Sequence, residues 1–250
     1  MDWTDQGIVL AARKHGESAL IVQLLTRAHG RHAGLVRGGA GRRLRGIYQP
    51  GNAVTARWRG RLAEHLGSFV CEPGTSHAAA LLDDPPRLAA LSAACAVAEA
   101  ALPEREPHVA VYEGFLALLD ALDRADRDEA ADKSAALWGE VYVRWELGLL
   151  SELGYGLDLT SCAATGRNDE LAYVSPRTGR AVSLSAGEPF RDRLLALPPF
   201  LAGRGPGAPA EIRDGLLLSG HFLERHVFAP LDRSSPPARA RLLERLASDL

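Results

Sequence analysis

Hydrophobic residues in the first third of the chain follow the short pattern of β-strands. Segments enriched in Val, Ile, Leu and Thr are separated by turn signals such as Gly, His-Gly and Pro-Gly. This pattern predicts five strands, at residues 7–13, 19–26, 32–37, 53–58 and 64–71. Five strands in so short a segment indicate a small β-barrel of the oligonucleotide-binding (OB) type. We place this domain at residues 1–78.

Beyond residue 78 the pattern changes to helical periodicity, with apolar residues three and four positions apart and prolines where helices begin or end. The predicted helices cover residues 87–102, 108–122, 134–153, 189–197, 211–228 and 236–247. Between the third and the fourth, at about 155–187, lies a compact insert with short β-like pieces. The predicted fold class is therefore α+β: a five-stranded barrel followed by an all-α helical domain, residues 79–250, that contains the insert.

Charge is distributed unevenly along the chain. The whole chain is nearly neutral, with 29 basic and 31 acidic residues, but residues 1–78 hold eleven Lys and Arg against five Asp and Glu. This segment has a net charge of +6, and the remainder has an excess of acid. Such asymmetry is typical of a polyanion-binding part joined to a part with another role.

The segment 36–48 is the strongest functional candidate. Its thirteen residues include four arginines, four glycines and no acid. Glycine lets the backbone approach a ligand closely, and the guanidinium group matches the geometry of phosphate oxygens. We therefore expect Arg37, Arg42, Arg43 and Arg45 to contact a phosphodiester backbone without reading its sequence. The alternative is a solvated surface loop without a ligand.

Three further arginines stand at alternate positions in and after the fourth predicted strand. If this segment is extended, Arg57, Arg59 and Arg61 lie on the face opposite Trp58. We therefore assign the arginines to the outer, phosphate-contacting face and Trp58 to the core. Exposed rings bind unpaired bases by stacking, and Tyr48, beside the arginine segment, is the aromatic candidate for such a contact.

Motifs of the common enzyme classes are missing from the sequence. It contains no Walker lysine loop, GxSxG or HExxH, so we expect no catalytic residue, no cofactor and no enzymatic activity. The three cysteines, at 71, 95 and 162, form no CxxC pair, which favours neither a metal site nor a disulfide framework. Without a signal-like start or a long apolar run, the chain is expected to be cytoplasmic, with no membrane partner.

Aromatic residues on the predicted helices 108–122 and 134–153 most simply form a domain core. The alternative is a groove for an acidic peptide beside Arg124, Arg127 or Arg144.

Several stretches resemble the RecO family of bacterial recombination and repair proteins, and the resemblance spans the whole chain. They are the run 7–26, His-Gly-Arg-His-Ala-Gly-Leu-Val-Arg-Gly-Gly-Ala-Gly at 29–41, Gln-Pro-Gly at 49–51, Gly-Arg-Leu-Ala-Glu at 60–64, the run 149–162, and Tyr-Val-Ser-Pro-Arg-Thr-Gly at 173–179.

This resemblance implies an N-terminal OB barrel and a C-terminal helical domain with a zinc-ribbon-like insert. It also implies a non-enzymatic mediator that binds single- and double-stranded DNA, anneals complementary strands and helps RecA load onto DNA coated by the single-stranded-DNA-binding protein. The implied partners are DNA, RecR and the acidic C-terminal tail of the single-stranded-DNA-binding protein.

The insert departs from the family pattern. Where many members have two Cys pairs, this chain has Cys162, Thr165, Ser183 and Ala186. We therefore expect no zinc, and an insert held by packing and hydrogen bonds. Alternatives to the mediator role are an RNA- or ribosome-associated OB-fold protein, a nuclease with scattered acids, and a protein scaffold whose basic segment serves only solubility.

Overall fold

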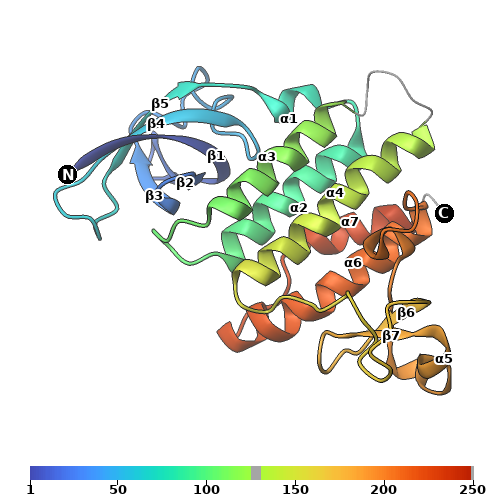
Figure 1. The fold of residues 1–250 in the computed structure, drawn as a ribbon. Helices are drawn as coiled ribbons and strands as arrows, with labels where there is room; N and C mark the ends of the chain where they lie inside the picture. The colour runs from blue at the N-terminus through green and yellow to red at the C-terminus, as the bar shows by residue number, and fades with distance from the viewer. Residues whose placement is uncertain (125–130, 249–250) are drawn as a thin grey trace. The chain divides into compact units, whose positions relative to one another are not determined.

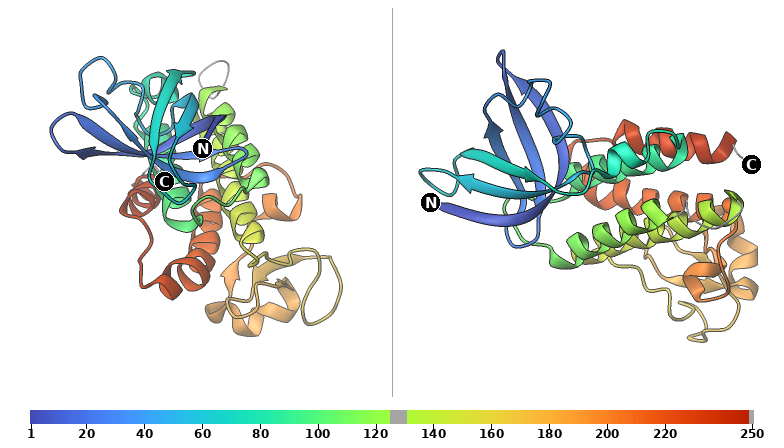
Figure 2. Two further views of the ribbon diagram at one scale, coloured as in Figure 1. Left: turned by 90° about the vertical axis from the view of Figure 1, so that its left-hand side faces the viewer. Right: turned by 90° about the horizontal axis from the view of Figure 1, so that it is seen from above.

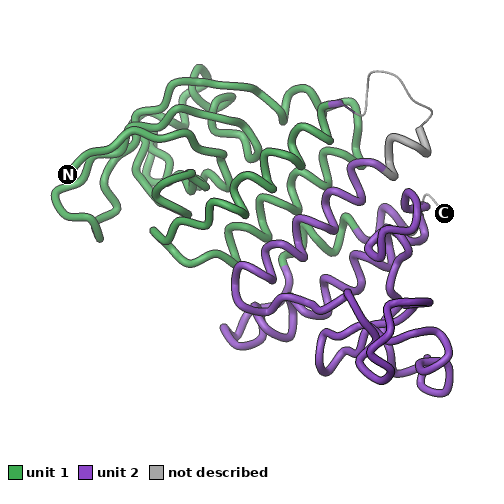
Figure 3. Tube along the Cα trace, viewed as in Figure 1, with its two compact units in different colours: residues 1–123, 236–242 green, residues 124–235, 243–250 purple. Residues whose placement is uncertain are grey.

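The computed structural model describes residues 1–124 and 131–248. They fall into two compact units, shown in Figure 3. Unit 1 comprises residues 1–123 and 236–242, and unit 2 comprises residues 124–235 and 243–250. These units divide the chain differently from the predicted domains 1–78 and 79–250, because helices that follow the barrel belong to unit 1. The domain assignment stays a prediction.

A closed five-stranded barrel forms the first part of unit 1 (Figure 1). Its strands pair in the order β1-β2-β3-β5-β4, antiparallel except for the parallel pair β3 and β5. This arrangement confirms the predicted OB-type barrel. The strands are β1 (Asp2–His15), β2 (Ala19–Thr26), β3 (Gly30–Val36), β4 (Ala53–Arg59) and β5 (Ser68–Pro73).

Side chains alternate between the inside and the outside of the barrel along β4. Trp58 is 1% exposed, and its indole Nε1 donates to the carbonyl of Leu66 at 3.0 Å. Arg57 and Arg59 are exposed, as alternation requires. The predicted core position of Trp58 is therefore confirmed. The bond to Leu66 connects β4 to the loop 60–67, and β5 begins after this loop, at Ser68, later than the predicted residue 64.

His32 is buried among aromatic rings inside the barrel. Its ring centroid lies 5.1 Å from those of Trp3 and Trp58 and 6.1 Å from that of Phe69. Neither ring nitrogen of His32 has a hydrogen-bond partner among the described residues. Burial, followed by the nearby charge of Arg105, lowers the pKa of His32 from 6.5 to about 4. The ring is therefore neutral in the folded barrel at neutral pH.

We expect the barrel to lose stability as the pH falls from about 6.5 to about 4. In this window the unfolded chain takes up a proton on His32 and the folded chain does not, so acid favours unfolding. The contribution of His32 is on the order of 1–2 kcal/mol between about pH 7 and about pH 5. Denaturant unfolding of His32→Phe should show a smaller pH dependence than wild type. The control His15→Phe, at an exposed position of the β1–β2 hairpin, should keep the wild-type dependence. An unaltered pH dependence in His32→Phe would contradict this explanation.

Helices α1 (His77–Ala80), α2 (Pro85–Ala101) and α3 (Val109–Arg124) follow the barrel. The carboxylate of Asp84 caps α2 by accepting from the backbone N–H of Arg87 at 2.9 Å, just where the proline pair predicted a helix start. Helix α2 packs on the barrel: the Cys95 thiol donates to the carbonyl of Val9 at 3.7 Å. The short helix α1 was not predicted.

Unit 2 is built on α4 (Ala131–Glu152) and α6 (Pro209–Leu223). Helix α6 continues as a π-helical turn, Glu224–Phe228. The backbone N–H of Gly207 donates to the Glu140 carboxylate at 2.6 Å, and Arg144 donates to the carbonyl of Phe200 at 2.6 Å. These bonds connect α4 to the segment that leads into α6. Helix α7 (Pro237–Ser248) contributes to both units.

The insert forms a three-stranded sheet in the order β7-β6-β8. The predicted helix 189–197 is wrong, because a 3₁₀ turn at Glu188–Arg193 is followed by strand β8, whose residue Ala196 pairs with Tyr173. The insert is therefore longer than predicted. Its elements are β6 (Leu171–Val174), β7 (Ala181–Ser183), α5 (Leu184–Gly187) and β8 (Leu195–Ala196), and two further 3₁₀ turns in unit 2 lie at Pro199–Ala202 and Ala229–Leu231.

The aromatic residues of α3 and α4 are core residues, as predicted. Each is at most 4% exposed: Tyr112, Phe115, Trp138, Tyr142 and Trp145. Arg127 lies outside the described residues. In the part of the chain that the structure describes, no helix combines the length and apolar character that a membrane span requires.

Candidate nucleic-acid interface

The connection between β3 and β4 is a series of tight turns anchored on the barrel. Backbone hydrogen bonds of 3.0 Å join Gly41 to Gly38, Leu44 to Gly41 and Ile47 to Leu44. Gly38 has a φ of 69°, which favours glycine. Leu44 and Ile47 pack against the barrel core. The apolar residues thus fix the loop on the barrel and leave its other positions to solvent.

The four arginines of this loop are all exposed: Arg37, Arg42, Arg43 and Arg45. None of them forms an ion pair with any residue that the structure describes. Elsewhere in unit 1, Arg13 and Arg27 do form such pairs, with Glu99 at 2.6 Å and Glu113 at 2.8 Å. The guanidinium groups of the loop are therefore available to an external anion.

The second predicted group of arginines belongs to the β4–β5 hairpin. Arg57 and Arg59 are on the outer side of β4, and Arg61 lies in the exposed loop that follows. Arg57 pairs with Asp2 at 3.3 Å, while the other two form no ion pair within the described residues. The structure thus gives two sets of exposed arginines, one on the 37–52 connection and one on this hairpin.

Tyr48 does not occupy the position that we predicted. It is 4% exposed and packs in the barrel core, and its hydroxyl forms a hydrogen bond with the Cys71 thiol. Burial raises the pKa of Tyr48 and raises that of Cys71 to about 11. A buried ring cannot stack on a base, so the predicted base contact of Tyr48 is wrong. Ile47 and Tyr48 lie three and four residues after Leu44. This spacing is the sequence signal that the three side chains share an inward face.

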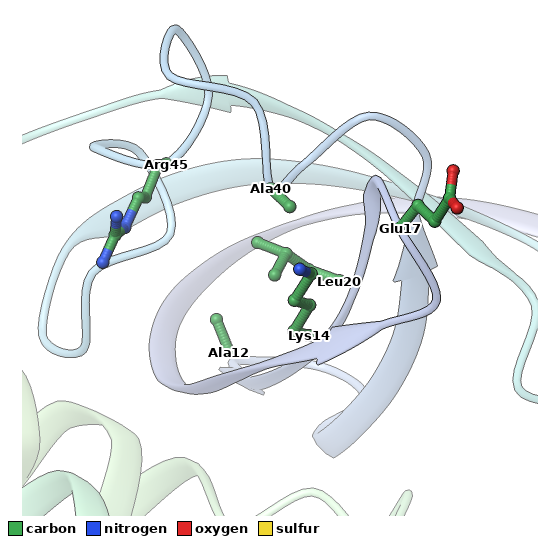
Figure 4. A pocket seen from close by; sticks show the side chains of 6 residues that line it. All are labelled: Ala12, Lys14, Glu17, Leu20, Ala40 and Arg45. Carbon is green, nitrogen blue, oxygen red and sulfur yellow. The ribbon is translucent and has the colours of Figure 1, made fainter.

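A cleft of about 390 Å³ lies between the β1–β2 hairpin and the arginine loop (Figure 4). The backbone N–H of Ala40 donates to the carbonyl of Ser18 at 3.0 Å and so ties the loop to the hairpin. Both views in Figure 2 show this hairpin, in dark blue, extending from the body of the barrel. The cleft is lined by Ala12, Lys14, Glu17, Leu20, Ala40 and Arg45.

Lys14 is a cleft residue that the sequence pattern did not indicate. It is exposed and, like Arg45, makes no ion pair within the described residues. The cleft thus joins one predicted arginine to a lysine from a separate element. Both cations line the same cleft, and their positive charge is suited to an anionic ligand.

Family models match both parts of the chain. The model described as Recombination protein O N terminal matches residues 1–71, and the model described as Recombination protein O C terminal matches residues 82–235. The chain belongs to the RecO family. The resemblance noted in the sequence is therefore confirmed.

Relatives named DNA repair protein RecO are similar over nearly the whole chain. The RecO protein of Rhodospirillum centenum is 59% identical and covers 98% of this chain and 94% of its own length. That of Rhodospirillum rubrum is 54% identical, covering 98% and 96%, and that of Phenylobacterium zucineum is 54% identical, covering 99% and 98%. The chain is thus a member of a family of DNA repair and recombination proteins.

The insert of this RecO-family chain is centred on one buried thiol. The Cys162 sulfur accepts from the backbone N–H of Ser183 at 3.2 Å, lies 3.4 Å from the Ser183 hydroxyl, and also forms hydrogen bonds with Thr165. Burial raises the pKa of Cys162, but these hydrogen bonds outweigh that effect and lower the pKa to about 6. One thiol and two hydroxyls do not fit zinc, which takes four Cys, His or carboxylate ligands. Within the described residues, no group of three or more His, Cys, Asp or Glu side chains is placed to hold a metal ion.

Proposed function

We propose that this RecO-family chain is a DNA-binding recombination mediator without catalytic activity. The observation that carries the proposal is the arginine loop on the OB barrel, with exposed guanidinium groups that no described carboxylate neutralises. Such groups bind the phosphates of single- and double-stranded DNA and release condensed counterions. Because the contacts are to the backbone, we propose binding that is independent of sequence.

Annealing of complementary strands follows from the same contacts. Two DNA strands repel each other through their phosphates, and bound arginine lowers that repulsion. Backbone contacts leave the edges of the bases free, so a strand held by the barrel can still pair with its complement. The proposed role of the protein is therefore to bring strands together; it breaks no bond and needs no cofactor.

The family context supports a further part of the proposal. In a cytoplasmic repair pathway, the chain would act with RecR and the acidic C-terminal tail of the single-stranded-DNA-binding protein, and would assist RecA loading on the coated DNA. The basic barrel is complementary in charge to both DNA and an acidic tail, which supports contact with each of them.

Strand annealing, measured with and without the single-stranded-DNA-binding protein, tests this proposal. The chain should accelerate pairing of complementary oligonucleotides under both conditions, and labelled DNA should stay intact in the presence of Mg²⁺. No acceleration under either condition would contradict the mediator role. Specific cleavage that a point mutation abolishes would instead show a nuclease.

Competition between DNA and RNA of equal length and sequence addresses the RNA-binding alternative. The proposed function predicts that DNA displaces a labelled DNA oligomer at least as well as RNA does. Strong preference for RNA would favour a role at RNA or ribosomes.

A further inference from the structure

We propose that the cleft beside the arginine loop takes one unpaired nucleotide of single-stranded DNA. Its base would lie against Ala12, Leu20 and Ala40, and its phosphate between Lys14 and Arg45 (Figure 4). This inference rests on the proposed function and adds a preference for unpaired DNA at one defined position. The loop arginines bind any backbone, whereas the cleft requires a base that is free to enter.

Strand pairing explains why one wall of the cleft is apolar and carries a charge at its edge. In the β1–β2 pair, Lys14 lies opposite Leu20, and Ala12 lies opposite Val22. Side chains at alternate positions share a face, so Ala12 and Lys14 point the same way. Leu20 belongs to the barrel core and is 8% exposed, which makes it a fixed surface for a ligand.

Alanine at positions 12 and 40 leaves the space that a planar base can fill. The cleft volume of about 390 Å³ is within the range of about 300–1,000 Å³ that ligand pockets occupy. The three apolar side chains offer no hydrogen-bonding group to a base edge. Contact with them is therefore to the face of the base, and it discriminates little among the four bases.

The charges around the cleft indicate where the phosphate lies. Figure 4 shows Glu17 on the hairpin turn, on the side of the cleft away from Arg45. Lys14 also lines the cleft, from the position on β1 that pairs with Leu20. A carboxylate repels phosphate, and two cations attract it. The phosphate is therefore assigned to the side between Lys14 and Arg45.

Duplex DNA cannot place a base in this cleft without giving up pairing and stacking for that base. An unpaired strand has no pairing to give up, so it can bind there at a smaller cost. The cleft thus gives the barrel a means to hold single strands in preference to duplexes, in addition to the phosphate contacts that both share.

The test fills the cleft without changing its charge. In full-length Ala40→Leu, affinity for a labelled oligothymidine should fall about three- to tenfold, because the added side chain takes the place of the base. Affinity for a duplex of equal length should stay unchanged. The control Ala63→Leu makes the same substitution in the exposed β4–β5 loop and should bind both DNAs like wild type.

A second variant removes the cation. Lys14→Ala should weaken single-strand binding more than duplex binding, whereas Arg13→Ala, which removes the same charge from a residue paired with Glu99, should not discriminate between them.

If wild type binds neither DNA, the proposed function itself fails. If wild type binds both but Ala40→Leu and Lys14→Ala affect single strands and duplexes equally, the cleft assignment fails and the proposed function stands. If Ala40→Leu unfolds at a lower temperature than wild type, the comparison of single-strand and duplex binding by Lys14→Ala tests the cleft assignment instead.

Discussion

Replacing Arg42, Arg43 and Arg45 together by alanine is expected to weaken binding to every DNA sequence on the order of 100-fold, which corresponds to about 1 kcal/mol for each arginine. The three side chains are exposed and without an ion-pair partner among the described residues, so their charge is available to phosphates. Removing each phosphate contact should also reduce the slope of log affinity against log salt by about 0.7 for single strands and about 0.9 for duplexes. Titration of labelled DNA at several salt concentrations measures both quantities.

A matched control separates local contact from general charge. Arg13→Ala combined with Arg27→Ala removes exposed arginines that already pair with Glu99 and Glu113. This double variant should keep nearly the wild-type slope. The triple variant should unfold at the wild-type temperature, because its substitutions are on the surface. A wild-type slope in the triple variant would falsify the assignment of the loop to phosphate contact.

Gly30→Ala is expected to destabilise the chain by about 3 kcal/mol or more, since a strained backbone and a steric clash act together. Gly30 has a φ of 64°, in the left-handed region, and it begins β3 directly against the backbone of Glu106. A Cβ added there would overlap the carbonyl of Glu106, which cannot move as a side chain could. The midpoint of denaturant unfolding should therefore fall sharply.

Gly16→Ala is the control for the strain alone. Gly16 has nearly the same φ, 61°, but an added Cβ would meet no heavy atom within 4 Å. Gly16→Ala should therefore lower the free energy of unfolding by only about 1–2 kcal/mol. Equal destabilisation by the two substitutions would show that packing of β3 against the segment before α3 contributes little. A large loss of stability in Gly30→Ala, but not in Gly16→Ala, would show that this contact helps to hold the barrel.

The barrel could be predicted because its signals are local. Alternation along β4 placed Trp58 inside and Arg57 and Arg59 outside, and the structure agrees. The start of α2 could be predicted because proline and the Asp84 cap act within one turn. The exposure of the loop arginines also follows locally, from turns whose apolar residues face the barrel.

Features that depend on distant partners could not be predicted in this way. Strand β8 has two residues and exists because it pairs with β6. The hydrogen bond between the Tyr48 hydroxyl and the Cys71 thiol forms because the barrel brings two separate segments together. Lys14 and Arg45 line one cleft although they belong to separate elements, which the hydrogen bond from Ala40 to Ser18 connects. In each case the partner residue is distant in the sequence, so a local pattern does not reveal the contact.

Amide hydrogen exchange of the full-length chain, with and without single-stranded DNA of mixed sequence, shows whether the barrel loop grips the DNA backbone. We expect DNA to slow exchange in residues 37–48 and in the adjoining β1–β2 turn, and added salt to remove this protection. Protection confined to regions outside the barrel, with unchanged exchange in residues 37–48, would rule out the loop as the site of DNA contact.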